Sequence, residues 1–267
     1  MIRISPIPAL EDNYFWLIQP DKHSRNAFIV DPGDATPVID ALSLEGLDLQ
    51  AILVTHHHSD HISGIAEVKE KFNVPVYGRQ SIRIPQITHP LLPGDSLQLD
   101  TLHHKTMTFQ VLDVAGHTLD HIAYFFAGDA LQPPSLFCGD ALFAGGCGRR
   151  FEGTEEVMWQ SLERMANLPD ETLIYCAHEY TLSNLRFAVA MEPDNIELQL
   201  RLQEVEKLRH QEVCTLPSSI GIEKRTNPFL RCHLPQLRKV VESLSGETCA
   251  TPARVFGTLR RLKDDWR

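Results

Sequence analysis

The chain has 267 residues, a hydrophobic fraction of 43% and a formal net charge of -10. This length fits one large domain, or a domain with a smaller one, and the hydrophobic fraction is ordinary for a globular protein. The acidic balance argues against a general nucleic-acid-binding surface. No apolar run approaches the length of a membrane span, and residues 1–8 lack the long apolar core of a signal peptide. We therefore expect a cytoplasmic protein with no nucleic-acid or membrane partner.

The first part of the chain alternates predicted strands and helices. Strands are expected at residues 2–7, 14–19, 27–30, 51–54 and 74–77. The segment Asp31–Asp34, with the sequence Asp-Pro-Gly-Asp, is a strong turn signal directly after the third of them. Helical spacing predicts helices at residues 37–44, where Gly46 ends the helix, and at 62–72.

The second part changes character towards its end. Strands are expected at residues 109–114, 121–126, 136–137 and 172–176, and a helix at 155–167 with Thr154 as its cap. After about Leu182 the strand signals stop, and helices are expected at residues 182–191, 195–211, 234–244 and 252–263. This pattern predicts an α/β domain in residues 1–170, followed by a smaller all-α domain in residues 171–267.

The six cysteines are scattered along the chain and show no paired spacing. Cys138, Cys147 and Cys176 each adjoin a stretch with candidate functional residues. We expect reduced, buried thiols at these positions, in keeping with a cytoplasmic protein.

The segment Thr55–His61 is rich in metal-binding side chains and directly follows the predicted buried strand at 51–54. His56 and His58 are two residues apart, so an extended backbone points both imidazoles to the same side. His57 then points away, so it is expected to support its neighbours or to be exposed. The segment has no cysteine, and its mix of imidazole and carboxylate suits catalytic zinc, iron or manganese better than a structural zinc. We interpret it as half of a two-metal hydrolytic site.

The same pattern of a strand followed by a metal-binding side chain occurs at three later positions, His117, Asp140 and His178. Loops at one edge of a sheet converge on one site in a layered α/β protein. A single histidine after a strand is more often structural, and an exposed histidine cluster is the alternative for the segment at 56–61. The four positions together favour a metal centre.

Several stretches spread over the chain carry a family resemblance: Asp12–Tyr14, Val30–Gly33, Thr55–His61, Ala115–Thr118, Phe137–Asp140, Gly145–Arg149, Phe151–Thr154 and Cys176–Thr181. The chain resembles the hydroxyacylglutathione hydrolases (the glyoxalase II family) of the metallo-β-lactamase superfamily. The resemblance implies an αββα sandwich followed by a helical domain. It also implies a binuclear metallohydrolase acting on thioesters, which splits S-D-lactoylglutathione into D-lactate and glutathione in methylglyoxal detoxification.

The resemblance further implies a set of ligands for two divalent ions, expected to be zinc, with iron or manganese possible for the same donors. His56, His58 and His117 would hold the first ion. The second ion would be held by Asp60, His61 and His178. Asp140 would bridge the two ions, and a hydroxide held between them would be the nucleophile. Asp60 and Asp140 are therefore the candidate catalytic residues, and Asp60 would also orient the hydroxide.

The glutathione contacts also carry over by position, to Arg149, Phe151, Tyr180, Arg260 and Lys263. The basic residues are candidates for binding a carboxylate of glutathione, because a guanidinium grips a carboxylate with two bonds. From the residues alone, a solvated helix face is the alternative for Arg260 and Lys263, and a core aromatic for Tyr180. Phe151 replaces the tyrosine of some members, which removes a hydroxyl contact and leaves a packing surface.

The sequence leaves the roles of two further residues open. Asp120 stands where the family usually has a small residue, and it is expected to lie beside the metal loop. His121 either supports the metal ligands or packs as a strand histidine.

Other functions compete with glutathione thioester hydrolysis. They are a lactonase or β-lactamase-like hydrolase of the same fold, a persulfide dioxygenase-like enzyme with one iron, an RNA-processing nuclease and a non-enzymatic binding module. The complete set of seven candidate ligands disfavours the mononuclear and non-enzymatic alternatives. The acidic charge disfavours the nuclease. We expect a monomer that acts on a small molecule.

Overall fold

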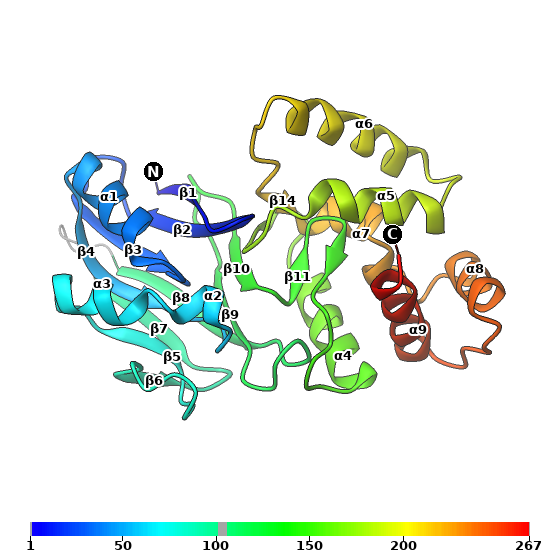
Figure 1. Ribbon diagram of the computed structural model, residues 1–267, viewed down its shortest axis with the longest axis horizontal. Helices are drawn as coiled ribbons and strands as arrows, with labels where there is room; N and C mark the ends of the chain where they lie inside the picture. Colours follow the sequence, from blue (N-terminus) through cyan, green and yellow to red (C-terminus); the bar gives the residue numbers. More distant parts are fainter. Residues whose placement is uncertain (1, 101–105, 267) are drawn as a thin grey trace. The chain divides into compact units, whose positions relative to one another are not determined.

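A computed structural model describes residues 2–100 and 106–266 of the chain. Two compact units make up the structure (Figure 1). The first unit comprises Met1–Asp113 and Asp120–Gly139, and the second comprises Val114–Leu119 and Asp140–Arg267. No helix among the described residues is both long enough and apolar enough to cross a membrane.

The first unit contains a six-stranded sheet whose strands follow one another in chain order. They are β1 (Arg3–Ala9), β2 (Asn13–Gln19), β3 (Asn26–Val30), β4 (Asp48–Leu53), β5 (Val76–Arg79) and β6 (His89–Leu91). The first three are antiparallel, and β3 to β6 are parallel. Parallel neighbours need crossover connections. In the chain, α1 (Ala35–Glu45) connects β3 to β4, and α3 (Ile65–Phe72) lies in the connection from β4 to β5. The parallel strands therefore end at one edge, where the loop after β4 begins.

One hydrophobic core joins these helices to the sheet. Val38 of α1 and Val68 of α3 pack with Ile29 and Ile52 of the central strands, and all four side chains are buried. Both ends of α1 are capped. The side chain of Asp34 accepts a hydrogen bond from Thr36 N at 2.9 Å, and Gly46 ends the helix in the left-handed conformation.

Four further strands of the first unit pair antiparallel in the order β10-β9-β8-β7. They are β7 (Ser96–Asp100), β8 (Thr106–Asp113), β9 (Ile122–Phe126) and β10 (Ser135–Gly139). Burial alternates along β7 and β8, as expected of a sheet with one face on the core and one face exposed. Burial raises the pKa of Tyr124 in β9 well above its usual value, so its hydroxyl stays protonated and donates to Val54 O at 2.7 Å.

The second unit consists mainly of helices. They are α4 (Glu155–Ala166), α5 (Thr181–Met191), α6 (Ile196–His210), α7 (Ile220–Thr226), the 3-10 helix η1 (Pro228–Leu230), α8 (Pro235–Ser245) and α9 (Pro252–Asp264). The unit also has a hairpin of β11 (Leu142–Phe143) and β12 (Gly146–Cys147), and a pair of β13 (Leu173–Cys176) and β14 (Ser218–Ser219). Aromatic rings from separate helices pack in its core. The ring centroid of Phe229 lies 6.1 Å from that of Phe187 and 6.1 Å from that of Phe256.

The structure confirms most of the predicted elements and corrects one of them. The single helix predicted at residues 62–72 is wrong, because a short helix, α2 (Ser59–Ile62), ends before α3 begins at Ile65. Asp60 and His61, the last two candidate ligands of the segment Thr55–His61, therefore lie on α2. The prediction of only helices after Leu182 holds for the described residues apart from β14, a strand of two residues. Such short strands carry no periodicity that a sequence can reveal.

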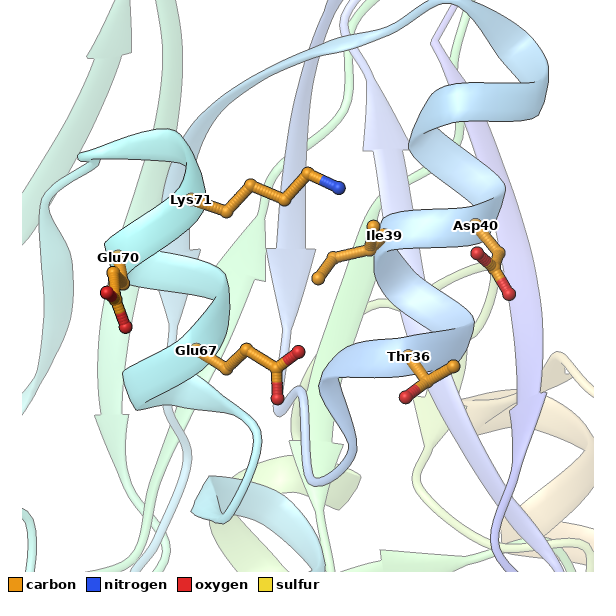
Figure 2. Close-up of a pocket in the computed structure, with 6 residues that line it drawn as sticks. All are labelled: Thr36, Ile39, Asp40, Glu67, Glu70 and Lys71. Carbon is orange, nitrogen blue, oxygen red and sulfur yellow. The ribbon is translucent and has the colours of Figure 1, made fainter.

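Figure 2 shows a groove between α1 and α3. Its lining side chains include acids and one base but neither a histidine nor a cysteine: Thr36, Ile39, Asp40, Glu67, Glu70 and Lys71. None of the candidate site residues lines this groove.

Candidate metal centre

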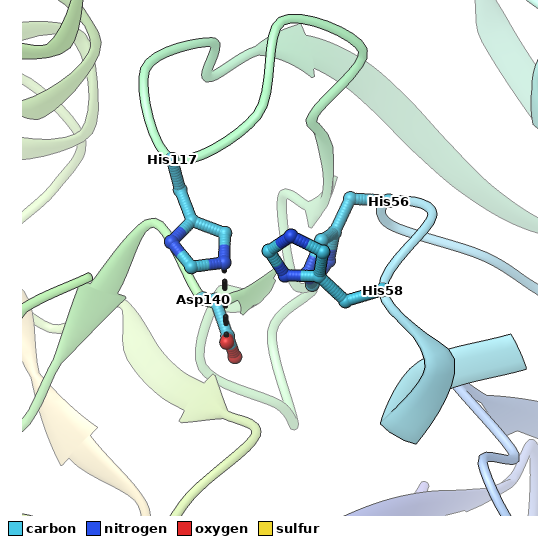
Figure 3. A group of neighbouring side chains, drawn as sticks. All are labelled: His56, His58, His117 and Asp140. Carbon is cyan, nitrogen blue, oxygen red and sulfur yellow. Dashed lines mark hydrogen bonds and ion pairs between the residues drawn. The ribbon is translucent and has the colours of Figure 1, made fainter. Parts of the chain in front are cut away.

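The loop after β4 and the short helix α2 carry the four candidate ligands of the first unit. His56 Nε2 lies 3.1 Å from His58 Nδ1, so the two rings direct a nitrogen to the same point, as their spacing predicted (Figure 3). His61 Nε2 lies 3.4 Å from Asp60 Oδ2. The segment thus presents two pairs of donors, one on the extended loop and one on the first turn of α2.

Asp31 supports this segment from the carboxyl end of the neighbouring strand β3. Its two oxygens accept hydrogen bonds from Thr55 N at 2.7 Å and Thr55 Oγ1 at 2.6 Å. Its Oδ2 also lies 3.0 Å from His61 Nδ1. A histidine whose Nδ1 is held by a carboxylate presents Nε2 to a metal, so this contact fixes the ring of His61 in the orientation a ligand needs.

The sequence treated Asp31 only as part of a turn and missed this role. The available signal was the position of Asp31 directly after β3. This strand is parallel to β4, which leads to the segment Thr55–His61. Asp31 has a φ of 51°, in the left-handed region that Asp tolerates better than most residues. The turn also packs Gly33 against the backbone of the segment Thr55–His61. A Cβ on Gly33 would clash with it, because it would lie 1.7 Å from Asp60 O. The Asp-Pro-Gly turn is therefore part of the support of the site.

His57 takes part in a different set of contacts from its neighbours. Its Nδ1 lies 2.8 Å from Asp120 Oδ1, and its Nε2 lies 2.7 Å from Arg83 NH1. Because Arg83 can only donate, Nε2 accepts, and Nδ1 carries the proton that bonds Asp120. Asp120 thus holds His57, in the middle of the segment Thr55–His61.

His121 is fully buried, just before β9. Its ring stacks on that of His56, with centroids 4.5 Å apart and planes at 10°. Its Nδ1 lies 3.1 Å from Ile122 O. Of the two interpretations left open by the sequence, these contacts favour support of a ligand over ordinary strand packing.

The second unit contributes three buried candidate ligands, two imidazoles around one carboxylate. Asp140 Oδ2 lies 3.5 Å from His117 Nε2, the ion pair dashed in Figure 3, and Asp140 Oδ1 lies 3.3 Å from His178 Nε2. Each oxygen therefore faces a different imidazole, which is the disposition of a bridging carboxylate. His117 Nδ1 lies 2.7 Å from Arg149 O, so its Nε2 is directed towards Asp140.

Two of the candidate substrate residues of the second unit, Phe151 and Tyr180, contact its candidate metal ligands. The ring of Phe151 meets that of His117 edge to face at 5.2 Å and is 60% exposed. The ring of Tyr180 stacks on that of His178, with centroids 4.7 Å apart. Both aromatic residues therefore lie against candidate ligand histidines, and Tyr180 is not an ordinary core aromatic.

The three basic candidates have unequal environments. Arg149 is exposed and has its Nε 3.6 Å from Asp264 Oδ1. Arg260 is buried, donates from NH1 to Cys147 O at 2.8 Å and pairs from NH2 with Asp264 at 3.2 Å. It therefore lies on no solvated helix face. Lys263 is partly buried and donates from Nζ to Ser183 O at 3.2 Å. Burial, followed by the nearby charge of Arg260, lowers the pKa of Lys263 from 10.5 to about 8.

Two protein-family models together match most of the chain. Residues 10–178 match the metallo-beta-lactamase superfamily, and residues 179–266 match the hydroxyacylglutathione hydrolase C-terminus. The hydroxyacylglutathione hydrolase of Nitrosomonas europaea is 46% identical over 267 residues, which cover 100% of this chain and 97% of that protein. That of Alkalilimnicola ehrlichii is 49% identical over 264 residues, 99% of each chain. The chain belongs to the hydroxyacylglutathione hydrolase family. The family is one of metallohydrolases within the metallo-β-lactamase superfamily, so the predicted class of enzyme is confirmed.

Solved structures of other proteins share the fold of this chain. ETHE1 from Myxococcus xanthus has a TM-score of 0.65 at 24% identity, covering 98% of this chain and 91% of that chain. TTHA1623, solved in a di-iron-bound form, has a TM-score of 0.55 at 24% identity, covering 85% of this chain and 100% of that chain. The predicted fold class is confirmed, a metallo-β-lactamase domain followed by a helical C-terminal domain.

The donors in this member of the family fit divalent metal ions. They are imidazoles and carboxylates without a thiolate, a combination that suits zinc, iron or manganese. His61 and His117 each have Nδ1 held by an oxygen, a carboxylate in one case and a backbone carbonyl in the other. The fold together with these clusters of His and Asp suggests a dinuclear metal site. The six cysteines form no disulfide among the described residues, and five of them, including Cys138, Cys147 and Cys176, are buried, as predicted.

Proposed function

We propose that this chain hydrolyses S-D-lactoylglutathione and related 2-hydroxyacylglutathiones, releasing D-lactate or the matching acid and glutathione. Membership of the hydroxyacylglutathione hydrolase family along the whole chain supports this substrate class. The geometric observation that carries the proposal is Asp140, which turns one oxygen to His117 and the other to His178. A carboxylate that faces two separate imidazoles suits two ions that share it.

We assign the seven candidate ligands to two ions as the family resemblance implies. His56, His58 and His117 would hold one ion, Asp60, His61 and His178 would hold the other, and Asp140 would be available to both. Figure 3 draws the proposed ligands of the first ion with the shared carboxylate. When bound, a pair of divalent ions supplies polarisation of the thioester carbonyl and ionisation of a water near neutral pH.

The residues of the chain have two tasks in this reaction. Asp60 accepts a hydrogen bond from Asn13 Nδ2 at 3.1 Å, and this contact holds its carboxylate in position to orient the attacking water. The leaving group is the thiolate of glutathione. Because a free thiol has a pKa of about 8.5, its departure needs no strong general acid from the protein.

Glutathione carries carboxylates, and we propose that Arg149, Arg260 and Lys263 bind them, with Phe151 and Tyr180 as the walls of the subsite. The exposed guanidinium of Arg149 supports its role. Arg260 is mostly committed to internal contacts, although its Nε has no hydrogen-bond partner among the described residues. Lys263 binds an anion in its charged form, which its lowered pKa restricts to a pH below about 8.

We further propose that the metals are zinc and that the enzyme acts as a monomer in the cytoplasm, with its domains divided at residues 170/171. Iron and manganese suit the same donors, and the related TTHA1623 was solved in a di-iron-bound form. Six cysteines that form no disulfide among the described residues are in keeping with a reducing compartment.

The test is metal analysis of the purified protein together with an assay of S-D-lactoylglutathione hydrolysis. We expect two ions per chain and hydrolysis of the thioester. A lactone and a β-lactam serve as comparison substrates for the other hydrolases of this fold. Two bound ions with lactone hydrolysis and no thioester hydrolysis would replace the proposed substrate class, and absence of bound metal would contradict the proposed mechanism.

A further inference from the structure

The side chain of Glu223 in α7 is a fully buried carboxylate in the second unit. Its Oε2 accepts hydrogen bonds from Gly145 N at 2.8 Å and from Asn227 Nδ2 at 2.9 Å. Its Oε1 accepts from Arg201 NH2 at 2.6 Å and from the hydroxyl of Ser218. A buried charge is costly unless it is paired and fully hydrogen-bonded, and both conditions hold here.

One oxygen of Glu223 binds the β11–β12 hairpin. Asn227, which donates to the same oxygen, also donates to Phe143 O at 3.2 Å and Gly146 O at 2.9 Å. Gly145 has a φ of +70°, and a Cβ there would lie 2.8 Å from Leu185 Cδ2, so only glycine suits this turn. The backbone of the hairpin tip is thus held by side chains of the helical region.

This hairpin connects two groups of the candidate metal centre. Asp140 lies just before β11. Arg149 lies just after β12, and its carbonyl oxygen is 2.7 Å from His117 Nδ1. The position of the hairpin therefore determines both where the shared carboxylate stands and how the ring of His117 is oriented.

The other oxygen of Glu223 binds the strand that leads to the third ligand. Ser218 pairs with Ile174 where β14 lies against β13. His178 follows two residues after β13 ends at Cys176. One carboxylate thus joins the hairpin of Asp140 to the strand pair of His178, and Arg201 neutralises its charge.

We propose that Glu223 is a positioning residue of the metal centre. It touches neither substrate nor metal, and it acts by holding Asp140 in its place between His117 and His178. The helical C-terminal region then has a part in metal retention in addition to the proposed binding of substrate. This inference rests on the proposed dinuclear function.

The experiment compares Glu223→Gln with the matched control Glu192→Gln. Glu192 forms a similar Arg–Glu pair in the same region, with Arg231 Nε at 2.9 Å and side-chain exposures of 20% and 10% for Arg231 and Glu192. The holoenzymes are mixed with a chromophoric chelator, and the rate of metal release, the unfolding midpoint, kcat and KM are measured. We expect metal release from Glu223→Gln to be about tenfold faster than from the control. We also expect a lower kcat with KM little changed.

A purely structural role would lower the unfolding midpoint in both variants and leave their metal release equal, which would overturn the inference. If Glu223→Gln does not fold, Ser218→Ala removes only the hydroxyl bond to Oε1. A smaller but distinct rise in metal release then supports the inference, and an unchanged rate overturns it. If the unmodified protein holds no metal, the proposed function itself fails. If it holds two ions and Glu223→Gln retains them as the control does, only the role of Glu223 is disproved.

Discussion

The two units contribute ligand candidates in different ways. Those of the first unit lie within the single segment Thr55–His61, which Asp31 holds through short-range contacts at the end of adjacent parallel strands. Those of the second unit come from three distant places in the chain, and a backbone carbonyl and the helical region hold them. A local motif can be supported by one turn, whereas a dispersed set needs the packing of a whole domain.

The largest effect is expected from Asp140→Ala. Loss of the shared carboxylate should reduce kcat by about a thousandfold and remove much of the bound metal, because both facing imidazoles lose their common partner. Activity and metal content of the purified variant are the measurements. Asp140→Asn, which has nearly the same shape, separates loss of charge from loss of volume. Retention of both ions and activity in Asp140→Ala would show that the second unit lacks a bridging ligand.

A smaller effect is expected from Asp31→Asn, which tests the support of the first unit. The amide no longer fixes the tautomer of His61, so metal affinity should fall by about 10–100-fold. Titration with a competing chelator measures this change. The unfolding midpoint of the apoprotein serves as the control, since a general loss of stability would lower it as well. An unchanged affinity would mean that the segment Thr55–His61 holds its shape without the turn.

A still smaller effect is expected from Asp120→Gly, which removes the carboxylate that His57 contacts. His57 loses its partner at 2.8 Å, but His56 and His58 keep their own contacts. Metal affinity should therefore fall by less than about tenfold, at the lower limit for residues that support ligands. Titration with the same competing chelator measures the metal affinity of this variant. A loss as large as that of Asp31→Asn would place the main support of the segment at its middle.

The smallest effect concerns pH and Lys263. Its pKa is lowered to about 8, so the amine is charged below that pH and becomes neutral as pH rises through it. KM for the glutathione thioester should therefore rise between about pH 7 and 9. Lys263→Arg keeps the charge over this range and should remove the pH dependence of KM. A pH profile of KM that is identical in the two proteins would exclude Lys263 from anion binding.

Sequence and structure agree best where function depends on local pattern. The strand before His56 and the strands before Asp140 and His178 were all predicted, and each is present as β4, β10 and β13. The assignment of individual ligands to ions stays a prediction. The split of the helix expected at 62–72 was missed, because apolar spacing runs on through residues 62–65 although the helix is interrupted at Ser63 and Gly64.

The supporting residues show where sequence reasoning ends. Asp31 appeared only as a turn residue, Arg260 as a surface or substrate residue, and Glu223 was not singled out. Their contacts join positions far apart in the chain, and neither periodicity nor spacing records which distant backbone group a buried side chain will meet. Arg260 illustrates this best, since it is buried against Cys147 although it belongs to a helix with a charged pattern.

By itself, the sequence determined the fold class, the family and the residue types able to bind metal, because strand periodicity and donor spacing are properties of neighbouring residues. Only the tertiary structure decided which nitrogen each histidine presents, that Asp140 faces two imidazoles, and that Glu223 connects the hairpin of Asp140 to the strand of His178. Those outcomes depend on hydrogen bonds between distant segments. Such bonds form when packing removes their groups from water and brings the distant partners within reach of one another.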